Sequence, residues 1–385
     1  MSFASSSRVT LGLVEETIPG QTPNSGHHAA LRFTGESLEA NRGKTQSEEI
    51  RDDRQISGMT TTSVDPRGGI NIEWSYREYD ALLRGLFGSN WVETTASITA
   101  TFSANGLTAG GGTPFAGLVA GQWIKISGAS QAENNGWFQI LDKSSGAALS
   151  FADNSFKPEA ATAGVSVQSS RLVNGVTPRF FSIERQHGDT GHCTVYRGCY
   201  PNKLSLQCDS QSKITGSFDF IGLSEASQSG SQLPGNRQPS QTHPLTNGVR
   251  SLRDLREAGQ PLACQIKSFS LSLDNAAQTA TACGTLGNVD IAPGTLAVLF
   301  SFEAYFNEGA ARLKRKHDFD EETGFAFRLE DVNGNGYAFQ LPNGQISKFS
   351  LTAGKINEFC MAKIEFTAYM DPRSGKTVLL DRCGI

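Results

Sequence analysis

The stretch that decides the fold is GGINIEWSYREYDALLRGLFG, which occupies residues 68–88. Its first half alternates in polarity. Ile70, Ile72 and Trp74 fall on one side of an extended chain, and Asn71 and Glu73 fall on the other. Alternation with a period of two predicts a β-strand with one buried face.

The second half of this stretch changes its period. Leu82, Leu83, Leu86 and Phe87 lie on one face of a short helix, and Gly88 stands where a helix commonly ends. The unit is therefore expected to be a strand that leads into a short packed helix.

The same unit returns later in the chain. Residues 294–316 read GTLAVLFSFEAYFNEGAARLKRK, so that WSYREY at 74–79 aligns with FSFEAY at 300–305, an offset of 226 residues. The basic last turn of the second copy suits the C-terminal end of a helix dipole. This match indicates an internal repeat, with a chance resemblance between two strand–helix segments as the alternative.

A second pair of segments supports the repeat. Residues 214–225, ITGSFDFIGLSE, align with residues 360–371, CMAKIEFTAYMD, at an offset of 146. The two offsets differ by 80 residues, which is the length of the segment 92–171. That segment is rich in Gly, Ala and Ser, with short alternating runs and turn signals such as NNG. It therefore reads as a small all-β module inserted into a loop of the first copy.

These patterns predict a mainly β protein with five parts. The expected parts are an N-terminal arm (1–29), a first repeat (30–91 and 172–225), the inserted module (92–171), a linker rich in Ser, Gln and Pro (226–261), and a second repeat (262–385).

Composition limits the classes of function. The chain has 385 residues, a net charge of −4 and 41 glycines. An acidic balance argues against a nucleic-acid binder, and abundant glycine favours strands and turns. We expect no secretory signal and no spanning segment, because the N-terminus lacks the signal pattern and no apolar run approaches about 20 residues. Seven cysteines without a CxxC pair are expected to be buried free thiols.

No motif nominates a catalytic residue, a metal site or a cofactor. DVNGNG at 331–336 begins like a calcium loop, but Pro342 stands where the loop needs a glutamate. HGDTGHC at 187–193 lacks the paired spacing of a zinc site. Both segments are predicted to be hairpin turns, and the protein is expected not to be an enzyme.

A long polar excursion, residues 36–69, separates two strands of the first repeat. Such excursions from a compact domain often make functional or partner contacts, with a flexible surface loop as the alternative. The equivalent stretch of the second repeat, 273–294, is shorter and nearly uncharged. We therefore expect only the first repeat to extend a long segment away from its domain.

The chain resembles the tail tube, or major tail, proteins of bacteriophages with long non-contractile tails. The resemblance covers most of the chain and rests on segments that occur in the family's order. These segments are LRFTGESL (31–38), INIEWSYREYDALLRGLFG (70–88), FFSIERQ (180–186), LSLDN (271–275), FQLPNGQISKFS (339–350) and, in the module, VAGQWIKISG (119–128).

This resemblance implies a tail-tube-type β-sandwich with a flanking helix in each repeat. Subunits of the family form rings whose sheets join edge to edge around a channel for DNA, and the rings stack through a long loop and terminal arms. Since a ring holds six copies of the fold, three duplicated chains are expected per ring, with six chains as the alternative.

The resemblance also implies partners and a location. The chain is expected to contact itself, the tape-measure protein and DNA in the channel, and the terminator and distal proteins at the tail ends, without a membrane. It is expected in the virion after assembly in the bacterial cytoplasm. A tail terminator or adaptor and a tail component that binds the host surface are the alternatives.

Two sets of residues are expected to carry these contacts. The candidates for contact between rings are Glu48, Glu49, Arg51, Asp52, Asp53 and Arg54, helped by the N-terminal arm. The candidates for the channel wall are Glu73, Asp219 and Glu365, since an acidic wall does not hold phosphate; ordinary outer-surface carboxylates are the alternative. The module is expected to project outward, with Trp123, Trp137 and Phe138 in its own core.

Overall fold

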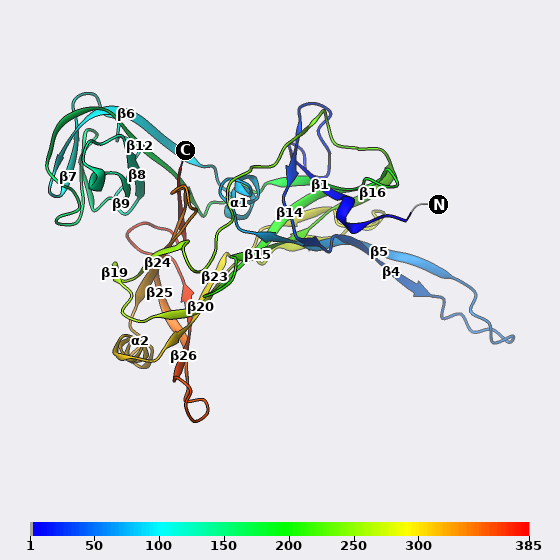
Figure 1. Cartoon of the computed structure of the whole chain (residues 1–385). Coiled ribbons are helices and arrows are strands. Elements are labelled where there is room, and N and C mark those ends of the chain that lie inside the picture. Colours follow the sequence, from blue (N-terminus) through cyan, green and yellow to red (C-terminus); the bar gives the residue numbers. More distant parts are fainter. Residues whose placement is uncertain (1–2, 385) are drawn as a thin grey trace.

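The computed structural model describes residues 3–384 of the chain. The first two residues of the expected arm and the last residue of the expected second repeat lie outside this range. The protein is mainly β, with 53% of residues in strands and 7% in helices. Figure 1 shows an elongated molecule, with the N-terminal repeat on the right, the C-terminal repeat at lower left and a separate β module at upper left.

The first repeat is built from two sheets that share one long strand, β14 (His192–Asp209). The sheet that ends in the long hairpin contains β3 (Gly35–Glu36), β4 (Glu39–Gln46), β5 (Met59–Glu73), β15 (Thr215–Ile221) and the second half of β14. The other sheet contains β2 (His28–Leu31), β1 (Val9–Glu16), β13 (Phe180–His187), the first half of β14, and β16 (Ser224–Ser229).

Helix α1 (Asp80–Phe87) follows β5, as the sequence predicts. It buries the apolar face that the period of 3.6 indicated, including Leu82, Leu83 and Leu86. Gly88 ends the helix in the left-handed conformation with φ of 61°, which glycine adopts without a steric penalty.

The second repeat uses the same order of elements. Its first sheet contains β20 (Ile266–Asp274), β23 (Ala297–Tyr305), β26 (Met361–Ala368) and the second half of β25 (Gly336–Thr352). Its second sheet contains β18 (Leu252–Glu257), β24 (Thr323–Glu330), the first half of β25, and β27 (Leu379–Cys383). Helix α2 (Glu308–Asp318) follows β23, and the Asn307 side chain caps it by accepting a hydrogen bond from the Ala310 amide.

The two repeats join into one curved sheet. Strand β14 of the first repeat pairs antiparallel with β20 of the second, with Lys203 opposite Asp274 and Leu206 opposite Leu271. The strand order across the molecule is therefore β4–β5–β15–β14–β20–β23–β26–β25. We call this the long sheet and the β14–β20 pairing the internal seam.

Strand pairing corrects one of the two sequence alignments. Ile70 lies opposite Phe218, and Phe302 lies opposite Ile364. Phe218 and Ile364 are equivalent, because β14 and β25, which pair with their strands, have a bulge at the same place. Phe302 rather than Leu296 therefore corresponds to Ile70, which changes the offset from 226 to 232. The slip of six is an even number, and an even shift leaves the inward and outward faces of a strand unchanged. Sequence alternation could not detect it.

The expected arm and linker both contribute strands. Within the arm, β1 pairs along the whole of β13, and, of the described residues, 3–8 precede this strand. Within the linker, β16 pairs with β14, and β18 pairs with β24. In this structure the second repeat therefore begins at β18, before residue 262. The polar composition of these edge strands gave no alternating pattern from which to predict them.

The β module lies between α1 and β13. Residues 88–179 connect α1 to β13 in the first repeat, whereas residues 319–322 alone connect α2 to β24 in the second repeat. The module contains β6 (Val92–Ser103), β7 (Gly106–Ala109), β8 (Trp123–Ser127), β9 (Gly136–Gln139), β10 (Asp142–Ser145), β11 (Ala148–Ser150) and β12 (Glu159–Val173). It has a separate hydrophobic core that includes Phe102, Leu107, Phe115, Phe151 and Phe156.

The module is fixed to the second repeat rather than attached by a loop alone. Strand β12 pairs with β27, with Ser170 opposite Arg382, and the buried Asp381 carboxylate forms an ion pair with Arg171 at 2.6 Å. The guanidinium of Arg328 lies 5.4 Å from the ring centre of Trp123 and 5.0 Å from that of Trp137.

These contacts correct part of the expected module core. Phe138 packs against the core of the module, as expected. Trp123 and Trp137 instead face the second repeat, and the Trp137 indole donates a hydrogen bond to the Gly334 carbonyl at 3.0 Å.

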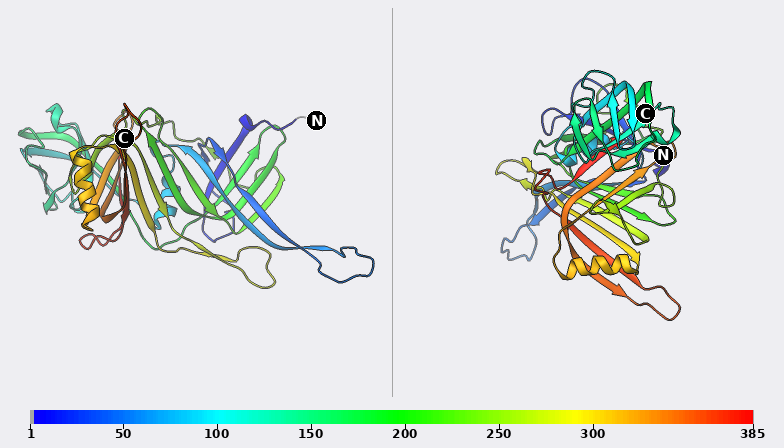
Figure 2. Two further views of the ribbon diagram at one scale, coloured as in Figure 1. Left: turned by 90° about the horizontal axis from the view of Figure 1, so that it is seen from below. Right: turned by 90° about the vertical axis from the view of Figure 1, so that its left-hand side faces the viewer.

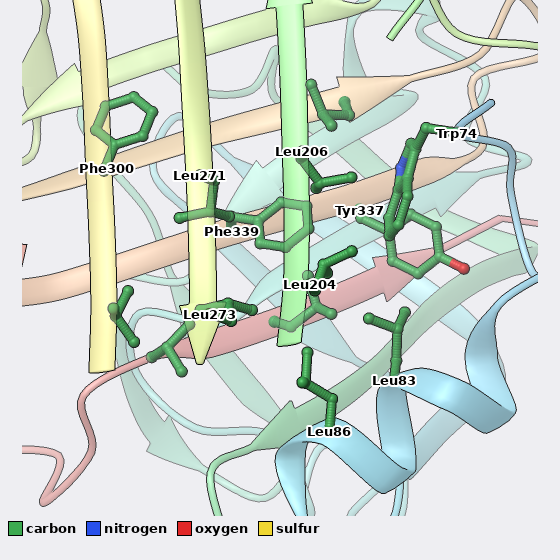
Figure 3. Close-up of a cluster of buried hydrophobic side chains, with 14 of the residues drawn as sticks. Trp74, Leu83, Leu86, Leu204, Leu206, Leu271, Leu273, Phe300, Tyr337 and Phe339 are labelled. Carbon is green, nitrogen blue, oxygen red and sulfur yellow. The ribbon is translucent and has the colours of Figure 1, made fainter. Parts of the chain in front are cut away.

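One hydrophobic core runs through both repeats (Figure 3). At the internal seam, Leu204, Leu206, Leu271 and Leu273 are all completely buried. Full burial of such a side chain contributes about 1.5–3 kcal/mol. The seam is therefore held by a continuous apolar layer as well as by backbone hydrogen bonds.

Candidate assembly surfaces

The long sheet has one apolar and one polar face. Phe218 and Ile70 face the core, whereas their neighbours Ser217 and Asn71 lie on the opposite side. The polar face is lined largely by small hydroxyl side chains, and the Ser270 and Ser301 hydroxyls lie within hydrogen-bond distance at 2.8 Å. Such a face offers many hydroxyls and little apolar surface.

All three candidates for the channel wall lie on this polar face. Glu73 pairs across the strands with Thr215, Asp219 with Gly69 and Lys203, and Glu365 with Ser301 and Lys348. The strand positions thus bring the three carboxylates to one surface.

Lysines accompany each of these carboxylates. The Lys213 ammonium lies 2.5 Å from Glu73, and the Glu365 carboxylate lies 3.6 Å from Lys348 and 3.7 Å from Lys363. Burial raises the pKa of Asp219 above its ordinary value, against the smaller lowering effect of Lys203.

The central part of the polar face is nearly neutral. The strand registers and ion pairs place on it the carboxylates Glu73, Asp209, Asp219, Asp274, Glu303 and Glu365, and the lysines Lys203, Lys213, Lys267, Lys348 and Lys363. Each of these lysines forms an ion pair with a carboxylate, which offsets its attraction for a polyanion.

The two outer strands of the long sheet each keep one open edge. Among residues 3–384, β4 pairs only with β5, and residues 346–352 of β25 pair only with β26. An open edge presents unpaired backbone groups that can accept another strand. Leu351 at this edge is 48% exposed on the core side of the sheet, whereas Leu206, at the equivalent position of the internal seam, is completely buried.

The polar excursion of the first repeat is a strand hairpin rather than an irregular loop. Strands β4 and β5 continue past the body of the sheet, as Figure 1 shows at lower right, and residues 47–58 form the hairpin tip. The tip carries all six residues expected to make inter-ring contacts: Glu48, Glu49, Arg51, Asp52, Asp53 and Arg54. Arg51 and Asp53 form an ion pair with each other at 2.7 Å, and this hydrogen bond lowers the pKa of Asp53.

Sequence reasoning missed the apolar residues of the hairpin tip. Ile50 is fully exposed, and Ile56 is 64% exposed. The signal was present in the sequence, because two isoleucines interrupt a charged run. A choice of contact candidates by charge alone leaves these two residues out.

Two segments that resemble metal sites form turns. In the β24–β25 turn, the Asp331 carboxylate accepts hydrogen bonds from the backbone amides of Asn333 and Asn335 at 2.8 and 2.9 Å. Residues 188–191 connect β13 to β14. In the part of the chain that the structure describes, no cluster of three or more His, Cys, Asp or Glu side chains could hold a metal ion.

No helix within residues 3–384 is both long enough and apolar enough to span a bilayer.

Comparison with known proteins identifies the family. The family model described as phage tail tube protein matches residues 6–368, nearly the whole chain. The match includes the first repeat, the internal seam, the hairpin and the second repeat up to the end of β26. No curated protein matches the chain. The chain therefore belongs to the phage tail tube protein family and is a structural component of the virion tail.

Proposed function

We propose that three copies of this chain close into a ring and that stacked rings form the tube through which phage DNA passes. The observation that carries the proposal is the internal seam. One repeat already joins the next by pairing β14 with β20, and the same two kinds of edge stay open at the ends of the long sheet. A repeated head-to-tail contact closes into a ring when its rotation allows.

The internal seam also defines how the chains would pair. Lys203 and Lys348 occupy equivalent positions, because they lie opposite Asp219 and Glu365 with a bulge at the same place in each strand. On the other side of the seam, Asn41 is equivalent to Asp274. The expected register between chains thus places Lys348 opposite Asn41.

The same register brings Leu351 of one chain opposite Leu38 of the next. Leu38 occupies the position of Leu271 at the internal seam, where the partner is Leu206. The exposed Leu351 would then be covered, as Leu206 is.

In such a ring the polar face of the long sheet becomes the channel wall. Its many hydroxyls let DNA slide, because its lysines are engaged in ion pairs with carboxylates and are held back from phosphate groups. Three duplicated chains supply the six copies of the fold. We infer that assembly takes place in the host cytoplasm, with the tape-measure protein filling the channel and the terminator and distal tail proteins at the tube ends.

Charge at the open edge tests ring closure. Leu351→Glu would place a carboxylate in the apolar layer between chains, and we expect the variant to remain a folded monomer. Leu299→Glu is the matched control, because Leu299 is 40% exposed but lies on a central strand of the polar face. Mass photometry and circular dichroism would measure assembly and fold.

The proposal requires the wild type and Leu299→Glu to form assemblies in multiples of three chains. Assembly of Leu351→Glu at the wild-type level would overturn the edge contact. Rings that contain six chains would retain edge pairing and reject the trimer.

A further inference from the structure

We propose that the hairpin tip (residues 47–58) of one ring docks on an apolar surface formed only by the second repeat in the adjacent ring. The occupant is thus a second copy of the same chain. This inference rests on the proposed ring assembly and adds the receiving surface and its threefold stoichiometry.

The donor and the receiver lie at opposite ends of the long sheet. Strand registers place the hairpin tip and residues 275–296 at one end, which we call the hairpin end. Residues 210–214, residues 353–360 and the starts of both helices lie at the other, the helix end. When rings stack in one direction, the hairpin end of one ring meets the helix end of the next.

The helix end of the second repeat exposes a group of large apolar side chains. We call it the apolar tip, and it consists of Tyr305, Phe306, Ile356 and Phe359. Ile356 is 90% exposed and Phe359 is 78% exposed, and the ring centres of Tyr305 and Phe359 lie 5.5 Å apart in an edge-on arrangement. The loop that carries Ile356 and Phe359 projects from the end of β25 and β26 at the bottom of Figure 1. A cluster of exposed apolar side chains of this kind often marks an interaction site.

The first repeat has no such surface at its helix end. Its equivalent β14–β15 connection, 210–214, is short and largely polar. The segment around Leu245 and Thr246 covers it, because Leu245 bridges to Ser75 and the Ile214 amide donates to the Thr246 carbonyl at 3.0 Å. The receiving surface therefore occurs once per chain.

The donor also occurs once per chain. Residues 275–296 are the second repeat's counterpart of the hairpin, and they fold along the first repeat (Figure 2, left, yellow). Asn288 donates to the Asp65 carboxylate and the Gly222 carbonyl at 3.0 and 2.9 Å, and Ile291 is buried near Phe180. These contacts hold residues 288–291 against the first repeat, and Figure 2 (left) shows that the loop ends well short of the hairpin tip.

The chemistry of the two surfaces matches. The hairpin tip presents Ile50 and Ile56 among four carboxylates and two arginines. The rim of the apolar tip carries both charge signs: Lys355 and Glu358 stand in the receiving loop, and Lys213, Lys267 and Lys363 beside it are each paired with a carboxylate. Isoleucine packed on aromatic side chains at the centre, inside a polar rim of mixed charge, is the usual anatomy of a protein interface.

One donor and one receiver per chain give three contacts between neighbouring rings of three chains. The stacking contact then distinguishes the two repeats, although the ring itself is nearly sixfold. Each ring is then rotated relative to the ring below it by one fixed angle, apart from multiples of one third of a turn. The β modules on the outside therefore follow regular rows along the tube.

A thiol pair tests the contact, because the receiving loop contains Cys360, which with Cys283 is exposed and not buried as the sequence led us to expect. In tubes of Ile50→Cys, a short bismaleimide should join each chain to a chain in the next ring, which gives a ladder on a denaturing gel. Wild-type tubes provide one control, because their other exposed thiol, Cys283, lies in the folded-back loop. The Ile50→Cys, Cys360→Ser double variant provides the second control and should give no ladder.

A ladder that persists without Cys360, or tubes of Ile50→Cys without any ladder, would overturn the receiving surface while leaving the ring proposal intact. Absence of rings in all variants would instead reject the proposed function.

An independent variant pair separates stacking from ring formation. Phe359→Asp should form rings of three chains that do not elongate into tubes. Phe319→Asp is the control, because Phe319 is 70% exposed but lies at the far end of α2. Normal tube length with Phe359→Asp, measured by electron microscopy, would contradict the proposal.

Discussion

Glu257 shows how a single buried charge positions α2 in the second repeat. Its side chain is 3% exposed and accepts hydrogen bonds from Lys316 at 2.5 Å, Thr323 at 2.5 Å and Arg312 at 3.1 Å. Burial alone would raise the pKa of Glu257, but the bonds from Lys316 and Thr323 outweigh it and hold the pKa below its ordinary value. Lys316 and Arg312 come from α2, so this carboxylate ties the helix to β18.

We expect Glu257→Gln to lower the free energy of unfolding at pH 7 by about 2–3 kcal/mol, because it leaves buried donors without their charged partner. The depressed pKa implies that this contribution is present above the unfolded-state value near 4.5 and is lost as the pH falls through the folded-state value. Urea titrations of unassembled protein at several pH values would measure both effects. Glu321→Gln, at an exposed position nearby, should change little, and equal pH slopes for wild type and Glu257→Gln would contradict the account.

At the scale of elements, the two seams differ in one ion pair. At the internal seam, Lys203 lies 3.7 Å from Asp274. The proposed seam between chains offers Lys348 but has the neutral Asn41 in place of the aspartate. The contact between chains thus lacks a charge that the covalently joined repeats retain.

Asn41→Asp should therefore strengthen association between chains, by about 0.2–1 kcal/mol for an exposed ion pair. The gain should shrink at high salt and disappear when Lys348→Met is added. Dissociation of rings on dilution would measure it in all four members of the double-mutant cycle. A gain that survives Lys348→Met would show that the register is wrong.

At the scale of the whole molecule, the β module would mark each chain on the outside of the proposed ring. It pairs with β27 of the second sheet, away from the polar face of the long sheet, so that it lies outside a ring built on that face (Figure 1). Averaged end-on electron micrographs of tubes should show three outer projections around the channel. Six projections would mean six chains per ring.

The sequence by itself determined the β class, the two strand–helix units, the presence of an inserted module and the charged residues of the hairpin tip. Each of these depends on local periodicity, on glycine at a helix end or on composition, which residues close in sequence express without long-range contacts. The family resemblance has the same origin, because the ordered segments that carry it are strands with characteristic polarity.

Only the tertiary structure decided how these pieces pair. Strand register is invisible to alternation, which is why the first repeat alignment slipped by six residues while the second held. The internal seam, the open edges, the folded-back loop and the docking of Trp123 and Trp137 all join residues far apart in the chain. Such contacts depend on shape and burial in the folded state, and no short stretch of sequence contains that information.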